Sequence, residues 1–195
     1  VSCLLGGSSM PANQYHFITH WRMEATIEEI IQVLGDAPGL VRWWPCVYLE
    51  ACDLVPGDSG GIGRSVEFLA KGWLPYTMRF KMMVTQAHPP FGFSMEATGE
   101  LVGTGVWALR QDGKQALIPY EWSVRTNKPL LRYFSMVMKP VFTANHTWAM
   151  DMGERSLRLE LARRHATATA DLVLIPPPPR PTPTSGLRFL LRLPA

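Results

Sequence analysis

Two adjacent polar residues, Asn145 and His146, interrupt an apolar stretch in the last third of the chain. An imidazole titrates near neutral pH, so His146 is a candidate acid or base, or a group that orients a ligand carbonyl. The structural alternative is a hydrogen bond to a loop carbonyl or a position at the edge of the apolar stripe, which we favour because buried polar groups are usually satisfied within the protein. On a helix the two residues lie about 100° apart, so at most one can point straight at a facing sheet.

No other residue pattern supports acid–base or nucleophilic catalysis. No local motif indicates a Ser-His-Asp or Cys-His set, and no paired carboxylates stand at an informative spacing. Glu67, Glu96 and Glu121 alternate with apolar residues in predicted strands, which places them on the solvent face unless a bulge shifts the register. The sequence therefore gives an acid–base mechanism little support.

Two patterns resemble ligand motifs only superficially. His16 and His20 are four residues apart, but they fall on the polar face of a predicted strand and lack the HExxH context of a zinc helix. The glycine-rich segment 57–63 lacks the Gly-Lys-Ser/Thr ending of a phosphate loop and precedes no helix, so it predicts a hairpin loop. We therefore expect neither a metal site nor a cofactor.

Composition and charge place the chain among globular proteins of one domain. Of its 195 residues, 47% are hydrophobic and 18% are charged. The net charge of +3 comes mainly from the last thirty residues, and the rest of the chain holds 16 basic and 15 acidic residues. A nearly neutral domain lacks the basic surface that binds nucleic acid, so we expect no nucleic-acid partner.

The cysteine count and the length of the apolar runs indicate the cellular compartment of the protein. The chain has three cysteines, Cys3, Cys46 and Cys52. An odd number of cysteines without a Cys-x-x-Cys pair argues against a disulfide framework and a zinc site. Residues 1–9 lack the features of a signal peptide, and no apolar run approaches the roughly 20 residues of a membrane span. These features predict a cytoplasmic protein without a membrane span.

The segment that carries Asn145 and His146, residues 128–164, predicts one long helix. Apolar residues recur there at alternating steps of four and three, which places them on one stripe. The stripe contains Leu130, Phe134, Val137, Val141, Asn145, Trp148 and Met152, and a second row with Leu131, Met138, Phe142 and Met150 widens it. Pro140, inside this helix, is expected to kink it. We also expect Pro140 to face a cavity between the helix and its partner sheet, where the kink could let the helix shift to admit a ligand.

The preceding residues predict strands that could curl around such a helix. Residues 14–23 alternate as a half-buried strand, and Thr26 and Glu29 have the capping-box spacing that starts a short helix. A second short helix is expected at 40–44, before Pro45. Six further strands are predicted, at 47–55, 64–70, 76–87, 91–97, 103–110 and 116–126. The expected fold is α+β: a curved antiparallel sheet of about seven strands wrapped around the long C-terminal helix, with two short helices after the first strand.

Three regions follow from this reading. Residues 1–13 form an N-terminal extension in which Met10 is a candidate natural start, residues 14–164 form the domain, and residues 165–195 form a proline-rich tail. Four consecutive prolines begin at Pro176, so we expect the tail to extend as polyproline or stay disordered rather than pack as a helix. A tail of this kind could also serve as an adaptor ligand for a partner protein.

Several of these segments resemble one known superfamily. They are WRMEA at 21–25, RWWP at 42–45 and NHTWAM at 145–150, in the predicted order of strand, helix pair and closing helix. Together they resemble the SRPBCC superfamily of START-like helix-grip proteins, and in particular its bacterial polyketide cyclase-like members. The resemblance implies a deep apolar cavity between the sheet and the last helix, opening near the short helices and the strand loops. It does not fix the function, since one fold hosts many activities.

Strand alternation and the helix stripe name the candidate ligand-binding residues. They are Tyr76, Met78, Phe80, Met82, Tyr120, Trp122, Val141, Phe142, Asn145, His146 and Trp148. For any one of them ordinary core packing is the alternative, and the same holds for Trp43 and Trp44, which could form a cavity lip. Methionines are frequent in this set, and methionine adapts to irregular space.

Two functions remain open from the sequence. The leading hypothesis is a non-catalytic binder or carrier of a hydrophobic small molecule, such as a lipid, a polyketide or an aromatic compound, with Tyr76, Tyr120, Asn145 or His146 fixing its orientation. The alternative is an aromatase/cyclase-like enzyme that holds a poly-β-keto chain in the same cavity and relies on proximity and orientation. The oligomeric state is left open.

Overall fold

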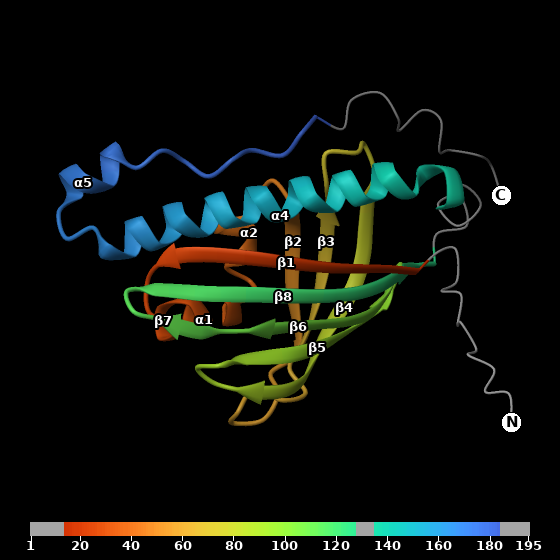
Figure 1. Ribbon diagram of the computed structural model, residues 1–195, viewed down its shortest axis with the longest axis horizontal. Helices are drawn as coiled ribbons and strands as arrows, with labels where there is room; N and C mark the ends of the chain where they lie inside the picture. Colours follow the sequence, from red (N-terminus) through yellow and green to blue (C-terminus); the bar gives the residue numbers. More distant parts are fainter. Residues whose placement is uncertain (1–13, 128–134, 184–195) are drawn as a thin grey trace, which may run out of the picture.

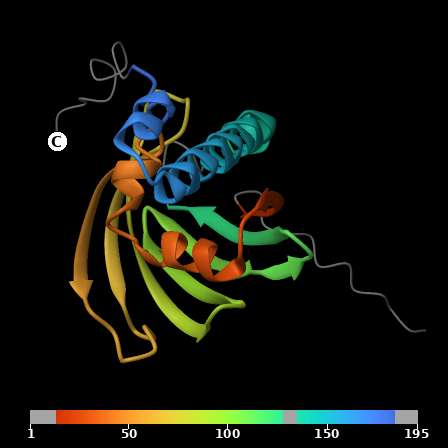
Figure 2. The same cartoon turned by 90° about the vertical axis from the view of Figure 1, so that its left-hand side faces the viewer.

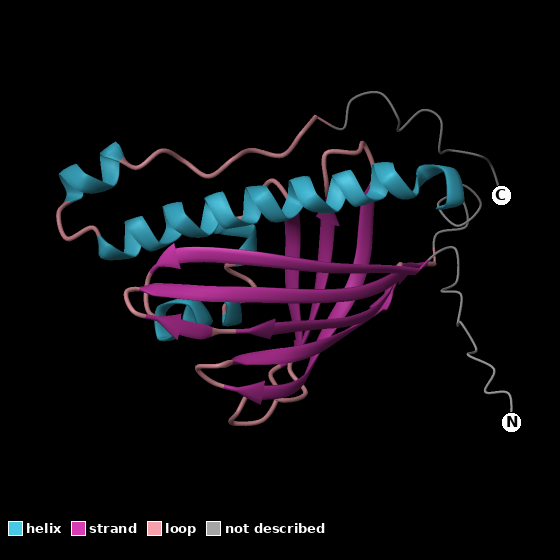
Figure 3. Cartoon of the chain, viewed as in Figure 1, coloured by secondary structure: helices cyan, strands magenta, loops and turns pink. Residues whose placement is uncertain are grey.

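The computed structural model describes residues 14–127 and 135–183, and it consists of a curved antiparallel sheet with one long helix across its open side (Figure 1). The strands are β1 (Gln14–Glu24), β2 (Tyr48–Val55), β3 (Ser65–Lys71), β4 (Thr77–His88), β5 (Gly92–Gly99), β6 (Leu101–Ala108), β7 (Arg110–Asp112) and β8 (Gln115–Thr126). The helices are α1 (Ile27–Gly35), α2 (Leu40–Trp43), α4 (Ser135–His165) and α5 (Thr169–Leu174). Figure 3 shows by colour that the long helix α4 covers the strands on one side, while the short helix α1 lies at the level of the strands. The α+β fold predicted from the sequence is confirmed.

All strand pairs are antiparallel, in the order β1-β8-β6-β5-β4-β3-β2, while β7 pairs with β8 alone. Seen along its other axis, the sheet is deeply curved, with α4 across its open side (Figure 2). Register shifts in β2 between Tyr48 and Glu50, and in β4 between Val84 and Gln86, are irregularities of the kind that bend strands. On β6, a Cβ at Gly103 would lie 2.0 Å from the carbonyl oxygen of Ser123, so only glycine permits this close approach.

The beginning of α1 follows the predicted capping box. Thr26 Oγ1 accepts a hydrogen bond from the Glu29 backbone N–H at 3.2 Å, and the Thr26 N–H donates to Glu29 Oε2 at 2.8 Å. Two backbone donors that the first turn would leave unpaired are thereby satisfied. The helix buries Ile27, Ile30 and Val33 against the sheet and fixes one end of the domain.

The face of α4 that meets the sheet differs from the predicted stripe. The buried or cavity-lining residues of this helix are Phe142, Asn145, His146, Ala149, Met150, Gly153, Ser156, Leu157, Glu160 and Leu161. At 100° per residue the centre of this face lies about 120° around the helix from the row through Val141, Trp148 and Met152, although Asn145 of that row and Phe142 and Met150 of the second predicted row do line the cavity. The pattern was misleading because the inward face contains small and polar residues. At Gly153 a Cβ would lie 2.3 Å from Trp44 Cζ2, and Glu160 is buried among arginines.

Pro140 does not take the predicted position. The helix continues from Ser135 through Pro140 to His165, and Pro140 is exposed rather than facing the cavity. The first part of the predicted helix, residues 128–134 with Leu130, Leu131 and Phe134, lies outside the described residues. A gating role for a cavity-facing proline therefore has no basis in this arrangement.

The tail packs more than the sequence suggested. Thr169–Leu174 form the short helix α5, and residues 175–183 then run extended beside α4 (Figure 1). The Arg163 guanidinium donates to the Pro176 carbonyl, and Lys71 Nζ donates to the Thr182 carbonyl at 2.5 Å. The described part of the tail thus folds back onto its own domain. Within the described ranges, no helix has the length and apolar character needed to cross a membrane.

Candidate functional site

A cavity of about 370 Å³ lies between the concave face of the sheet, the α1–α2 pair and α4. The side chains around it are mostly aromatic, aliphatic or methionine, and they come from seven of the strands, from both short helices and from α4. The inward positions of each strand supply them because side chains alternate across a sheet. The apolar cavity that the family resemblance implied is therefore present.

Nine of the eleven residues named from the sequence line this cavity. They are Tyr76, Met78, Phe80, Met82, Tyr120, Trp122, Phe142, Asn145 and His146. Val141 and Trp148 do not line it, because the inward face of α4 is rotated away from the predicted stripe. Trp148 instead packs against the edge of the hydrophobic core.

One wall of the cavity is built on the β6–β8 pair. The rings of Trp107 and Tyr120 stack with centroids 4.0 Å apart, and Tyr120 stacks on Trp122 at 6.0 Å. Gly105 leaves room for these rings, since a Cβ there would lie 2.9 Å from Trp122 Cε3. Trp107 was not among the residues named from the sequence, although its alternation within the predicted strand 103–110 could have identified it.

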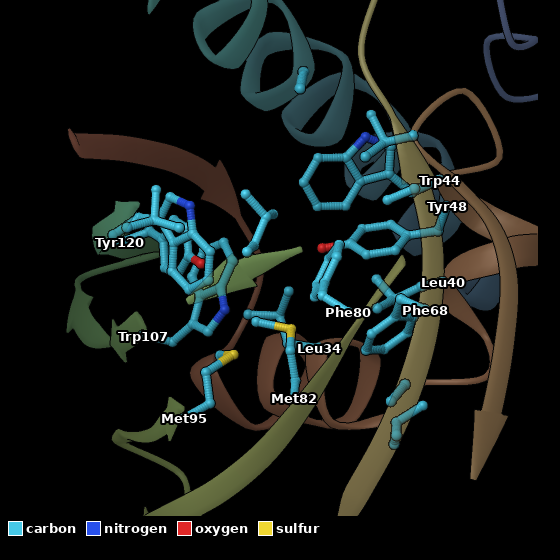
Figure 4. A pocket seen from close by; sticks show the side chains of 18 of the residues that line it. Leu34, Leu40, Trp44, Tyr48, Phe68, Phe80, Met82, Met95, Trp107 and Tyr120 are labelled. Atoms are coloured by element: carbon cyan, nitrogen blue, oxygen red, sulfur yellow. The ribbon is translucent and has the colours of Figure 1, made fainter. Parts of the chain in front are cut away.

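The opposite wall comes from α2, β2, β3 and β4. Trp44 contacts Tyr48 edge to face at 5.3 Å, Tyr48 contacts Phe68 at 5.1 Å, and Phe68 lies 6.0 Å from Phe80. Figure 4 shows Trp44, Tyr48, Phe68 and Phe80 facing Trp107 and Tyr120 across the pocket. Trp44 lines the cavity, whereas Trp43 is fully buried in the core.

His146 lies against β1 at the end of the cavity beneath α4. Its ring stacks on Phe17 with centroids 3.9 Å apart, and its Nε2 has no hydrogen-bond partner among the described residues. The loop-carbonyl hydrogen bond that we favoured from the sequence is thus not observed. Burial lowers the pKa of His146 to about 4, so the imidazole is neutral at pH 7.

Asn145 also reaches the cavity, although the helical spacing suggested that only one of the pair would. Its Oδ1 accepts a hydrogen bond from the Leu74 backbone N–H at 3.1 Å. The β3–β4 turn passes so close that a Cβ at Gly72 would lie 2.1 Å from Asn145 Oδ1. Asn145 therefore fixes the turn that precedes Tyr76.

The tyrosine hydroxyls of the cavity are strongly desolvated. Burial raises the pKa of Tyr48 to about 12, and burial together with nearby Tyr15 raises the pKa of Tyr76 to about 12. The pKa of Tyr120 is raised well above its ordinary value, first by burial and then by Tyr48. All of these hydroxyls stay protonated and can donate a hydrogen bond at neutral pH.

The mouth of the cavity is formed by loops and by the end of α1. Exposed lining residues there are Gly35, Gly60 and Pro89. Arg64 bridges two sides of this mouth: its Nη2 donates to Asp53 Oδ1 at 2.9 Å and its Nη1 to the Gly35 carbonyl at 2.8 Å. This position agrees with the opening near the short helices and the strand loops.

Of the polar patterns that the sequence analysis set aside, the two histidines lie away from the cavity, whereas Gly60 and Gly61 of the glycine-rich segment line it. His16 and His20 are exposed on the outer face of β1, where His16 Nδ1 lies 2.8 Å from Ser123 Oγ. Segment 57–63 forms the β2–β3 hairpin loop. Among the residues that the structure describes, no group of three or more potential metal ligands comes together.

No protein-family model matches the sequence, and no curated protein matches it at a significant level. Solved structures do match the fold. The Zhui aromatase/cyclase from Streptomyces sp. R1128 is 13% identical, with a TM-score of 0.62 over 80% of this chain and 98% of that chain. A START superfamily protein from Mycobacterium smegmatis is 10% identical, with a TM-score of 0.56 over 73% of this chain and 98% of that chain.

A third match is the protein TTHA0849 from Thermus thermophilus, which is 11% identical with a TM-score of 0.59 over 73% of this chain and 97% of that chain. At such identities the likeness shows the fold alone. The strand order, the closing helix and these matches together show that the chain has a helix-grip fold, which it shares with the aromatase/cyclase and the START superfamily protein.

Proposed function

We propose that this protein binds an apolar small molecule in the cavity between its sheet and α4. The observation that carries the proposal is the cavity itself, about 370 Å³ in volume and lined by aromatic and methionine side chains. That volume falls within the range of roughly 300–1,000 Å³ typical of ligand pockets. Each Å² of apolar surface removed from water contributes about 25 cal/mol to binding.

The shape of the walls supports a ligand that contains rings. Trp107 and Tyr120 present stacked flat surfaces on one side, and the Tyr48 and Phe68 rings lie opposite. Met78, Met82 and Met95 line the space between these walls. Methionine side chains adapt to irregular ligand shapes, so the cavity suits a family of related molecules.

A cyclase-like enzyme is the second candidate, supported by the fold that the chain shares with proteins named aromatase/cyclases. The protonation states favour binding over proton transfer. A histidine with a pKa of about 4 is a weak base, and a tyrosine with a pKa of about 12 is a weak acid at pH 7. Catalysis here would rest on positioning the substrate.

The two candidates are separated by substitution. If the protein is a carrier, His146→Ala and Tyr76→Phe are expected to change only the affinity for the bound molecule. If either variant abolished turnover of a poly-β-keto substrate while the substrate still bound, the enzymatic function would replace the carrier function.

Extraction of the purified protein tests the proposal directly. We expect mass spectrometry of an organic extract to detect an apolar compound in stoichiometric amount, and to detect much less with Met82→Trp, which fills the cavity. Met83→Trp is the matched control, because Met83 is exposed on the other face of β4. Equal extracts from both variants would contradict binding in the cavity.

A further inference from the structure

Four polar side chains gather at the end of the cavity beneath α4, and none of them carries a charge at neutral pH. They are Tyr15, Tyr76, Asn145 and His146, and all line the cavity. We call this group the polar end. The ring of Tyr15 lies 5.9 Å from Phe17, and Phe17 in turn stacks on His146 at 3.9 Å. Asn145 fixes the backbone of Leu74, two residues before Tyr76.

The polar end contains hydrogen-bonding atoms that the protein leaves unused. Tyr15 Oη and His146 Nε2 are buried and have no hydrogen-bond partner in the described part of the chain. A buried polar atom without a partner costs folding free energy, and a ligand that supplies the partner recovers it. A tyrosine hydroxyl can donate or accept, and a neutral imidazole offers one donor and one acceptor, so an oxygen of a carbonyl or hydroxyl group would suit them.

Burial keeps these groups neutral. It raises the pKa of Tyr15 above its ordinary value and that of Tyr76 to about 12, and it lowers the pKa of His146 to about 4. The side chains of the polar end therefore offer dipoles and no charge, while the ammonium of the exposed Lys139 lies 5.9 Å from the centre of the Tyr15 ring and does not line the cavity. An ionised carboxylate that entered would lose its hydration without gaining an ion pair.

The two cationic residues among the described lining side chains are occupied elsewhere. Arg64, at the mouth, is bound to Asp53 and to the Gly35 carbonyl. Lys71 follows the inward positions Phe68 and Ala70 of β3, and its Nζ donates to the Thr182 carbonyl at 2.5 Å. Each cation thus donates to other groups of the protein.

From these observations we infer that the polar end selects an uncharged ligand bearing a carbonyl or hydroxyl oxygen, and that it rejects a carboxylate of the same shape. This inference rests on the proposed binding function and specifies the chemical class of the ligand. Tyr15, which the sequence analysis did not name, would be a specificity-determining residue together with His146.

Three naphthalene compounds test the inference by isothermal titration calorimetry at pH 7. Naphthalene supplies the ring alone, 2-acetylnaphthalene adds a neutral ketone, and 2-naphthoate replaces the methyl ketone with an isosteric carboxylate. We expect 2-acetylnaphthalene to bind about tenfold more tightly than naphthalene, as one net hydrogen bond would provide. We expect 2-naphthoate to bind more weakly than both.

Variants assign the effect to the polar end. Tyr15→Phe and His146→Phe keep the rings and are expected to reduce the ratio of the ketone's affinity to that of naphthalene. His16→Phe is the matched control, because His16 neighbours Tyr15 on β1 but is exposed on the opposite face. If the ketone kept its full affinity advantage over naphthalene in Tyr15→Phe and His146→Phe, as it should in His16→Phe, the assignment to the polar end would be contradicted.

Three other results of the calorimetry would contradict the inference or the proposed function. If the ketone binds no more tightly than naphthalene, the inference is wrong while binding in the cavity stands. If 2-naphthoate binds most tightly and Lys71→Met removes that binding, the cavity selects anions and the inference is overturned. If none of the three compounds binds, the proposed function fails and this inference fails with it.

Discussion

At the residue scale, the properties of the cavity follow from desolvation. Tyr48, Tyr76, Tyr120 and His146 all have pKa values displaced toward the neutral form, and burial is the largest cause in each case. The sequence could name Tyr76, Tyr120 and His146 as candidates, because strand alternation and helical spacing are visible in it, but it did not identify Tyr48. It could not show that His146 Nε2 would lack a partner, since that depends on which groups the fold brings within reach.

His146 should make stability depend on pH. Its folded-state pKa of about 4 lies below the ordinary 6.5, so between these values the unfolded chain binds a proton that the folded protein does not. Stability from the neutral imidazole is therefore complete above pH 6.5 and is lost as the pH falls toward 4. Where the unfolded chain binds one proton more than the folded protein, the free energy of unfolding changes by roughly 1.4 kcal/mol per pH unit.

Replacing the ring removes this dependence. We expect His146→Phe, which keeps the stack on Phe17, to flatten the slope of the unfolding free energy against pH between 6.5 and 4 in urea titrations. The exposed His20→Phe serves as the control and should leave the wild-type slope in place. An unchanged slope in His146→Phe would show that the imidazole is not desolvated in the folded protein.

At the element scale, the position of α4 is fixed by polar contacts at its C-terminal half. Glu160 is buried at 3% side-chain exposure, and its carboxylate accepts hydrogen bonds from Arg42 on α2 at 2.6 and 2.9 Å and from Arg164 at 3.0 Å. Burial alone would raise the pKa of Glu160, but the hydrogen bonds and charges of the two arginines lower it overall. This clamp holds α4 with its Phe142–His146–Ala149 face over the cavity.

The clamp helps to explain why one row of the predicted helix stripe, with Val141 and Trp148, was wrong, while Asn145, Phe142 and Met150 do line the cavity. Hydrophobic periodicity indicates the helix face that is richest in large apolar residues, which here is the row containing Val141 and Trp148. The inward face instead depends on Gly153, which makes room for Trp44, and on Glu160, whose ion pairs make a charged residue tolerable in the interior. Neither feature is visible before the partner elements are known.

Two glutamates on α4 allow a matched test of the clamp. Glu160→Gln should lower the free energy of unfolding by about 1–3 kcal/mol, because a buried carboxylate with three charge-assisted bonds is replaced by a neutral amide. Glu154→Gln should cost less than about 1 kcal/mol, because Glu154 is 28% exposed, against 3% for Glu160, and pairs with Arg158 as an i,i+4 neighbour. Urea denaturation measures both, and equal losses would contradict the role of Glu160 in docking α4.

At the scale of the whole molecule, the fold was largely predictable and the function only in outline. Turn residues, alternation and the Thr26–Glu29 capping box identified the sheet and the short helices, because these signals are local. The second aromatic wall, with Tyr48 and Phe68, was not named although both residues lie in predicted strands, because their ring contacts with Trp44 and Phe80 depend on how β2, β3 and β4 curve around the cavity. The tail was expected to extend or remain disordered, yet part of it forms α5, and Thr182 contacts Lys71 and Gly72.

The central claim is that the interior of this domain admits an apolar guest, and calorimetric titration with 2-acetylnaphthalene tests it most directly. We predict saturable binding at one site per chain, at least tenfold weaker in Met82→Trp and unchanged in Met83→Trp, because only the first side chain enters the cavity. Saturable binding that the Met82→Trp substitution leaves intact, or no binding by the folded wild-type protein, would contradict the account.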